Sequence, residues 1–443
     1  MSLQKIIHGY LPEEKPPIGR LLLFALQQIL VMFPATVLVA LLTGFHVSTT
    51  IFASGLATLC FLFVTRGKIP LYYGSSFSYI AAIVGITGAK FGVTAPDALI
   101  SQAQFGIIAS GLVSIVAGLI VSRFGLDKIE KVLPPSITGS IALVIGISLA
   151  GTAMSQAAGF DAATGAASNS SWIVALVTLL ATILFSVYLR GLWSQLPILL
   201  GILVGYVVSI PLGLIDFAKI TQSNLLQVPH FTLPQVSWPA VLAIMPIAIA
   251  TIPESTAHLF QLDIYVNDLA DRKGKPRRDI AGRLGSNLIG DGIGDIVSSL
   301  FGGPAGTNYG ENISTMAITK NFSVWVLGAA AILTMIISFI GPLSAAVGSI
   351  PSAVINGACI YLFGVIAAQG VAIMINRKVD LFNAKNLAVI ATVLIIGLGG
   401  TYAFPGGMIP LFGIQAPAIA TASLFGILLN LVLSIGKTEQ KVE

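Results

Sequence analysis

Two short polar stretches decide the fold of this chain: YGSSFS at residues 73–78 and YGENIS at residues 309–314. Both lie in short apolar segments, while the segments around them are longer and almost free of charge. Each opens with a tyrosine–glycine pair, and glycine allows a backbone or a ligand to approach closely. Their similarity, so far apart in the chain, indicates two copies of one structural unit.

The composition indicates a membrane protein. The 443 residues are 55% hydrophobic and only 9% charged, whereas a soluble domain has about 25% charged residues. Apolar runs of about 20 residues, the length that spans a bilayer, recur along the whole chain. We therefore expect an all-α polytopic protein with the lipid bilayer as a partner. Cys60 and Cys359 lie inside apolar runs and indicate no disulfide framework. A polar start followed by a spanning run also predicts no cleavable signal.

The hydropathy pattern predicts fourteen membrane segments. Their approximate ranges are 18–43, 50–65, 76–89, 102–122, 133–152, 172–189, 195–214, 237–262, 280–300, 311–319, 322–347, 351–375, 385–403 and 415–435. The two polar stretches fall in the third and tenth segments, which are the shortest.

The positive charges support this count. With the N-terminus in the cytoplasm and the segments alternating, all 23 lysines and arginines except Lys90 and Lys219 fall on the cytoplasmic side. Short cytoplasmic loops carry such an excess in membrane proteins. Removing one short segment would invert the segments after it and destroy the asymmetry. The net charge of +5 therefore reflects topology, and we expect no nucleic-acid partner.

The two halves of the chain resemble each other weakly. FPAT at residues 33–36 matches IPES at residues 252–255 in position, and Gly139 and Gly146 are spaced like Gly357 and Gly364. Chance similarity between apolar sequences is the alternative explanation. Because seven crossings is an odd number, a second copy would sit inverted in the membrane. The pattern thus predicts a 7+7 inverted repeat, which many secondary transporters use.

Two ionisable residues in the eighth segment indicate a polar site within the membrane. A carboxylate at the bilayer centre costs about 2.5–3.5 kcal/mol even on a lenient scale. Glu254 and His258 are four residues apart, so a helix places them on one face. Such a pair can hold and pass a proton near neutral pH. A buried pair that locks helices together is the alternative. A metal site is not expected, because one histidine and no cysteine cluster accompany the glutamate.

Three further acidic residues fall in predicted segments. Glu311 follows Gly310, and interrupted, glycine-bearing segments at matching places in two halves indicate a binding site near the midplane. A re-entrant loop without a special role is the alternative. Asp291 and Asp295 lie in GDGIGD at residues 290–295. Apolar flanks argue against a calcium loop there. We expect these residues to brace the ninth segment against the tenth, and a direct ligand role for Asp291 stays open.

Several of these motifs together resemble the nucleobase–ascorbate transporter family, and within it the bacterial uracil permeases. The similarity runs from QQILVMF at residues 27–33 through the fourteenth segment. The most specific pieces are GKIP at residues 67–70, GSSF at 74–77 and NYGENI at 308–313, followed by Thr319-Lys320.

The resemblance implies a fold and a division into domains. Fourteen segments would form the 7+7 inverted repeat, with short strands in segments three and ten. Segments one to four and eight to eleven would form a core domain, residues 1–131 and 236–348. Segments five to seven and twelve to fourteen would form a gate domain, residues 132–215 and 349–436. A homodimer in the bacterial cytoplasmic (inner) membrane, with both termini cytoplasmic, is also implied.

The resemblance further implies the site. Glu254 and Glu311 would bind the ring N–H groups and carbonyl edge of a nucleobase, with backbone groups of Phe77 and Gly310, and Tyr309 would line the pocket. His258, Ser76 and Glu254 would serve proton coupling. A supporting group would comprise Asp291, Asn312 and Ala35. No cofactor or metal is expected beyond the proton as coupling ion.

The sequence departs from the family pattern at four places. Gln28 and Ser255 stand where uracil permeases usually carry histidine, Pro253 precedes the glutamate, and Ser314 replaces a common glycine. These changes bear on the substrate and the coupling more than on the fold. Glu311, where purine-type members often have glutamine, favours uracil.

The expected function is therefore proton-coupled import of a nucleobase, uracil first, by alternating access. A xanthine or purine permease of the same family is the main alternative. An inorganic-anion exchanger of the same architecture would need a positive charge where Glu311 stands. A membrane enzyme or receptor would need a nucleophile–base set, a metal cluster or a sizeable soluble domain, and the longest hydrophilic stretch is only residues 263–279. We expect no enzyme activity.

Overall fold

A computed structural model describes residues 9–90, 92–125, 134–160, 165–411 and 414–435. The predicted cytoplasmic positions of Lys5, Lys128, Lys131, Lys437 and Lys441 lie outside these residues, as do both ends of the chain.

Long apolar helices dominate the described part of the chain. Eight helical stretches are long and apolar enough to cross a membrane, and four shorter apolar helices accompany them. The long stretches are α1 (Ile18–Thr43), α2 (Val47–Val64), α4 (Asp97–Phe124), α6 with α7 (Pro135–Ser148, Ala150–Ala157), α8 (Asn169–Tyr188), α11 to α12 (Trp238–Ile244, Ala248–Arg272), α17 (Ser352–Asn376) and α18 to α19 (Ala384–Leu394, Gly400–Ala403). The shorter ones are η1 with α3 (Phe77–Tyr79, Ile80–Thr87), α9 (Pro197–Ser209), α15 (Val324–Ile337) and α20 (Ala418–Ser434).

The remaining elements are shorter or more polar. They are β1 (Tyr73–Ser75), α10 (Ala218–Thr221), α13 (Leu284–Leu300), β2 (Gly306–Asn308), α14 (Gly310–Thr319), α16 (Gly341–Gly348), β3 (Met408–Leu411) and β4 (Ile414–Pro417), with short turns η2 (Gly191–Gln195), η3 (Met245–Ile247), η4 (Ala281–Arg283), η5 (Ile395–Gly399) and η6 (Pro405–Gly407).

Prolines and glycines mark many helix ends. Pro135 stands at the start of α6, where its missing N–H costs nothing. Gly44 ends α1 in the left-handed conformation, with φ 77°, and its N–H donates to the carbonyl of Ala40. The sequence therefore specifies the end of α1 through a local glycine cap.

One group of helices packs through close backbone contacts around α4 and α13. A Cβ at Gly111 would lie 2.5 Å from the carbonyl oxygen of Gly292, and one at Gly118 would lie 2.7 Å from that of Gly285. Small residues allow membrane helices to approach this closely, which increases van der Waals contact where no hydrophobic effect drives association. α1, α2, α11 and α15 pack around the same group.

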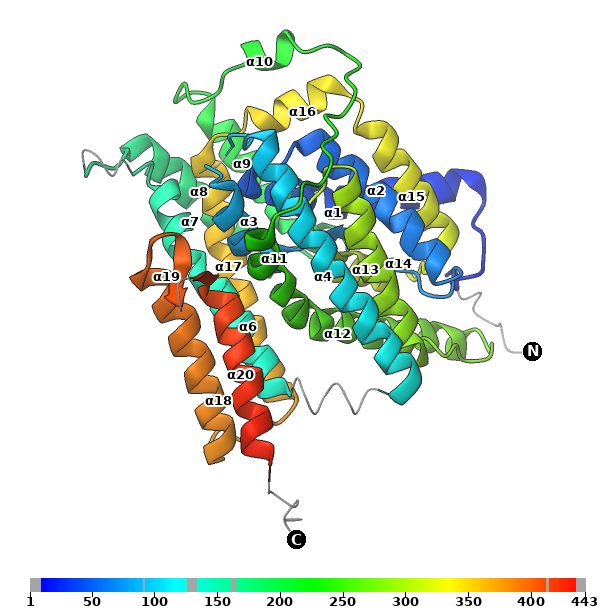
Figure 1. The fold of residues 1–443 in the computed structure, drawn as a ribbon. Helices are drawn as coiled ribbons and strands as arrows, with labels where there is room; N and C mark the ends of the chain where they lie inside the picture. Colours follow the sequence, from blue (N-terminus) through cyan, green and yellow to red (C-terminus); the bar gives the residue numbers. More distant parts are fainter. Residues whose placement is uncertain (1–8, 91, 126–133, 161–164, 412–413, 436–443) are drawn as a thin grey trace.

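A second group of helices forms around α17. Helix α17 contacts α6, α7, α8 and α9. Helices α18 and α20 contact each other and α6. Gly139 and Gly370 provide the close approach between α6 and α17, with a Cβ at Gly370 only 2.5 Å from the carbonyl oxygen of Gly139. In Figure 1, α18 and α20 lie with α6 on one side of the molecule, far from α2 and α15.

The two polar stretches meet in the first group. β1 and β2 pair antiparallel, with Tyr73 opposite Asn308, Gly74 opposite Thr307 and Ser75 opposite Gly306. Each strand leads into a helix, η1 with α3 in one case and α14 in the other.

Two features differ from the hydropathy-based ranges. The predicted segment 322–347 ends as a helix at Ile337, and α16 begins separately at Gly341 because Pro342 cannot continue the preceding helix. The predicted segment 415–435 begins as a helix only at Ala418, since residues 414–417 pair with β3 as a hairpin. Neither a four-residue strand nor a three-residue break between two helices has a hydropathy signature.

Candidate functional site

The strand pair fixes the starting points of two short helices. The backbone N–H of Ser76 donates to the carbonyl oxygen of Ala305 at 3.0 Å, and that of Tyr309 donates to the carbonyl oxygen of Tyr72 at 3.1 Å. The two strands therefore stay paired up to the residues where their helices begin. Helix N-termini carry partial positive charge and unpaired N–H groups. Two such ends, one at each end of the strand pair, favour binding of carbonyl or other electron-rich ligand atoms.

Three elements bring Glu254, Glu311 and Ser78 together. Glu254 lies on α12, and the Ser78 hydroxyl on η1 donates to its Oε2 at 3.4 Å. Glu311 lies in the first turn of α14, directly after Gly310, which contacts the ring of His258 one turn along α12 from Glu254. Two like charges are expensive to hold together within a membrane. A ligand that donates hydrogen bonds, or a proton, relieves that cost.

Glu311 is exposed, and Glu254 and Phe77 are partly exposed. These three side chains are therefore not fully packed among the surrounding helices, and a ligand can reach them.

His258 lies beside the start of α14. Its ring contacts Gly310, where an added Cβ would lie 2.9 Å from Nε2 of the imidazole. The Nδ1 atom is buried and has no hydrogen-bond partner among the described residues. One turn along α12 separates this ring from Glu254. Any larger residue at position 310 would push the imidazole away from the helix end.

Tyr309 is fixed by its own contacts. The hydroxyl donates to the carbonyl oxygen of Ser75 at 2.9 Å and lies 3.0 Å from the hydroxyl of Thr36. Its ring packs against Gly74, where a Cβ would lie 2.3 Å from ring carbons. Tyr309 is buried, and its contacts join the start of α14 to β1 and α1.

Ser76, named from the sequence for proton coupling, and Asn312 and Ala35, named as support, lie at three different elements. The Ser76 hydroxyl accepts a hydrogen bond from Ser78 N at 3.3 Å and so caps η1. Asn312 donates from Nδ2 to Oε1 of Gln28 at 2.7 Å and thereby ties α14 to α1. Ala35 is buried in the apolar core around α1.

A buried polar network stands behind the glutamates. The Ser255 hydroxyl donates to Oδ2 of Asp291, and Nδ2 of Asn287 donates to the Ser255 hydroxyl at 2.7 Å. Asn308 of β2 donates from Nδ2 to Oδ1 of Asn287 at 3.1 Å and lies 3.3 Å from Oδ2 of Asp291. The network joins α12, α13 and β2. Sequence reasoning missed Asn287 and Ser78, although an amide inside an apolar segment is itself a signal of interhelical bonding.

Asp295 holds the two strands. Its Oδ1 accepts from the hydroxyl of Tyr73 at 2.5 Å and from the backbone N–H of Gly306 at 2.8 Å. One carboxylate on α13 thus binds β1 through a side chain and β2 through the backbone. This arrangement braces α13 against the start of the tenth segment.

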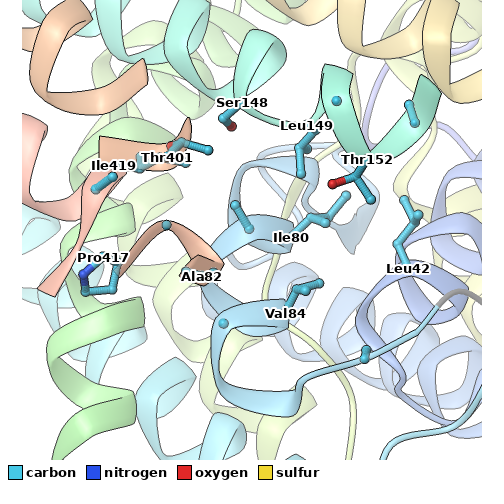
Figure 2. Close-up of a pocket in the computed structure, with 18 of the residues that line it drawn as sticks. Leu42, Ile80, Ala82, Val84, Ser148, Leu149, Thr152, Thr401, Pro417 and Ile419 are labelled. Atoms are coloured by element: carbon cyan, nitrogen blue, oxygen red, sulfur yellow. The ribbon is translucent and has the colours of Figure 1, made fainter. Parts of the chain in front are cut away.

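A cavity of about 640 Å³ lies between the two groups of helices. Figure 2 shows Ile80 and Val84 of α3, Leu42 of α1, and Ser148 and Thr152 among the residues that line it. The lining reaches Ile80, three residues beyond Phe77, but does not include Glu254 or Glu311. The two carboxylates therefore lie outside this cavity.

Comparison with known proteins gives the family. A family described as "Permease family" matches residues 19–406. The chain is 37% identical to the uracil permease of Bacillus caldolyticus, over 95% of this chain and 94% of that one. It is 34% identical to the uracil permease of Escherichia coli (strain K12), over 95% and 93% of the two chains.

Solved structures support the fold alone. The murine Solute Carrier 26 family member A9 anion transporter in its inward-facing state matches 96% of this chain and 69% of that one, with a TM-score of 0.68 and 13% identity. The transmembrane domain of the cyanobacterial bicarbonate transporter BicA matches 93% and 96%, with a TM-score of 0.54 and 15% identity. Together with the apolar helices, the family match identifies a multi-pass membrane protein: the chain belongs to the permease family and is a transporter rather than an enzyme.

Proposed function

We propose that this chain imports uracil together with a proton across the bacterial cytoplasmic membrane. The observation that carries the proposal is that α12 presents Glu254 to the Ser78 hydroxyl of η1 and His258 to the start of α14, where Glu311 stands. Full-length identity of 34–37% to uracil permeases supports the choice of base.

The chemistry of the site suits a planar, neutral base. Uracil offers two ring N–H donors and two carbonyl acceptors along its edge. The two carboxylates accept from the N–H groups, while backbone N–H groups of Phe77 and Gly310 donate to a carbonyl. A base with a different pattern leaves buried polar groups unpaired, which gives strong discrimination. The same carboxylates repel an inorganic anion, so the anion-transporter fold neighbours do not decide the substrate.

Proton coupling follows from the two carboxylates. Loading a proton on Glu254, or on the unpartnered nitrogen of His258, removes one charge before the loaded site moves. Without that proton, two like charges would remain near the bilayer centre at a cost of a few kcal/mol. No metal or organic cofactor has a part in this scheme.

Movement would occur between the two groups of helices. The group containing α1–α4 and α11–α15 is the core domain of the proposal, and the group containing α6–α9 and α17–α20 is its gate domain. The cavity between α3 and α6 then serves as the approach to the site. Fourteen segments in a 7+7 inverted repeat, with both termini in the cytoplasm, complete the proposal, and we expect a homodimer.

A transport panel tests the substrate and the coupling. The chain is expressed in a bacterial strain that lacks uracil uptake, and radiolabelled uracil, xanthine and adenine are supplied with and without a protonophore. Uptake of uracil that collapses with the proton gradient is the expected result. Uptake of xanthine alone would assign the purine alternative, and uracil uptake that ignores the protonophore would remove the symport.

A further inference from the structure

A cluster of two histidines and one aspartate lies far from the glutamates. His46 stands directly before α2, Asp97 is the first residue of α4, and His230 belongs to the connection between α10 and α11, residues 222–237. The charge distribution assigns all three loops to the external side. One ligating atom from each residue can be chosen so that all three lie within 4.8 Å of one another.

The distances suit a shared ligand. Nε2 of His46 lies 3.1 Å from Oδ1 of Asp97, and Nε2 of His230 lies 2.7 Å from Oδ2 of the same carboxylate. The two imidazole rings are 4.3 Å apart between centroids and tilted by 45°. Ligand atoms around a tetrahedral zinc ion are about 3.3 Å apart, given bond lengths near 2.0–2.2 Å. Small side-chain rotations therefore bring one nitrogen of each ring and one carboxylate oxygen around a common point.

The backbone holds these positions in place. The carbonyl oxygen of His230 accepts from the hydroxyl of Thr49 at 2.7 Å, in the first turn of α2. Thr232 and Gln104 exchange two hydrogen bonds, at 2.8 and 2.9 Å, which tie the same connection to α4. The three loops thus meet at fixed points before any ion binds.

We propose that His46, Asp97 and His230 bind a divalent transition-metal ion of the zinc class on the external surface. Two imidazole nitrogens and one carboxylate oxygen form a ligand set that such ions prefer, and water completes the coordination. The side chains of Asp97 and His230 are 53% and 56% exposed, so the ion reaches the site from solvent and exchanges with it. A bound ion pins the connection 222–237, which links the two halves of the chain, to the turn before α2 and the start of α4.

Zinc titration of the whole purified protein tests the proposal. The protein is prepared with a tag free of histidine, stripped with a chelator and titrated with ZnCl₂ by calorimetry at pH 7.5. One ion per chain with micromolar affinity and a raised Tm is expected. His46→Ala, Asp97→Asn and His230→Ala each weaken binding about tenfold or more, because each removes one ligand. Asp216→Asn, which changes an exposed carboxylate on the same side, leaves the affinity unchanged.

Two results would overturn the site. One is the absence of saturable binding to the wild type, which would leave the cluster a hydrogen-bonded group only. The other is undiminished binding by the His46→Ala/His230→Ala double variant. The wild type gives a further check that needs no variant. Protonation of imidazole competes with zinc, so affinity must fall between pH 7.5 and pH 5, and equal affinity at both values contradicts the assignment.

Discussion

At the scale of single residues, Ser255 lies directly after Glu254 but belongs to the buried polar network. Its hydroxyl bonds with Asp291 and Asn287. Polar groups buried in a low-dielectric interior are costly only when they lack partners. The network therefore stabilises the orientation of α12 against α13.

Replacing Ser255 by alanine should destabilise the protein. The change leaves Nδ2 of Asn287 without its acceptor, while Asp291 keeps only the hydrogen bond from Asn308. An unsatisfied buried polar group costs about 1–3 kcal/mol. Thermal unfolding of the purified protein measures the loss as a lower Tm. Ser194→Ala is the matched control, since the Ser194 hydroxyl bonds only close chain neighbours, donating to the carbonyl of Gly191 and accepting from Nε2 of Gln195. Equal Tm values for the two variants would show that the network is dispensable.

At the scale of elements, the strand pair depends on one residue of α13. Asp295 accepts hydrogen bonds from Tyr73 and from the backbone of Gly306, and so holds β1 and β2 in register. Three-residue strands are too short to be stable alone. Their position therefore depends on tertiary contacts, and the starts of η1 and α14 depend on the strands.

Asp295→Ala should loosen both strands, whereas Asp295→Asn should have a smaller effect because the amide retains an acceptor oxygen. Hydrogen exchange measures this directly. Amides of residues 306–308 are expected to exchange faster in the alanine variant than in the asparagine variant. Unchanged protection in both would mean that β1 and β2 hold each other without α13.

The elements also show what sequence alone predicts. α1 spans the same residues, 18–43, as the first hydropathy segment. An apolar run of this length forms a helix in a bilayer, because a helix satisfies its own backbone hydrogen bonds. β1 and β2 came only from the family resemblance, since three residues have no periodicity. The hairpin of β3 and β4 and the break before α16 were not predicted, because they depend on local turns inside apolar sequence.

Only part of the candidate site could be predicted from the sequence. The free-energy cost of ionisable groups at the bilayer centre identified Glu254, His258 and Glu311 as functional candidates. Composition could not indicate that Ser78 reaches Glu254, because a serine is cheap to bury anywhere in a helix. Nor could it indicate that the Tyr309 hydroxyl bonds with Ser75 and Thr36.

At the scale of the whole molecule, the N-terminal segment is attached to the loop after α12. Glu14 accepts from Nζ of Lys273 at 2.7 Å, from Lys275 and from the backbone N–H of Leu11 at 2.9 Å. Burial alone would raise the pKa of Glu14, but the hydrogen bonds from the two lysines outweigh it and lower the pKa to about 2. The segment before α1 is thereby tied to the far half of the chain.

This contact predicts a pH dependence. Because the pKa of Glu14 is lower in the folded state than its ordinary value of 4.5, its stabilising effect is complete above that value. The effect is lost as pH falls from about 5 towards 2. Glu14→Gln should lower Tm at pH 7, by a few degrees for a loss of about 1.5 kcal/mol. The variant should also lose less Tm than the wild type between pH 7 and pH 4. Parallel pH profiles for the two proteins would contradict the role of Glu14.

The central claim is that Glu254 and Glu311 together bind a nucleobase, and equilibrium binding of radiolabelled uracil to the purified protein tests it most directly. Glu254→Gln and Glu311→Gln each remove a charged acceptor worth about 1.5–3 kcal/mol, so each should weaken uracil binding by about 10- to 100-fold. Asp216→Asn should bind like the wild type, with all four proteins of equal Tm. Wild-type affinity in either glutamine variant would contradict the account.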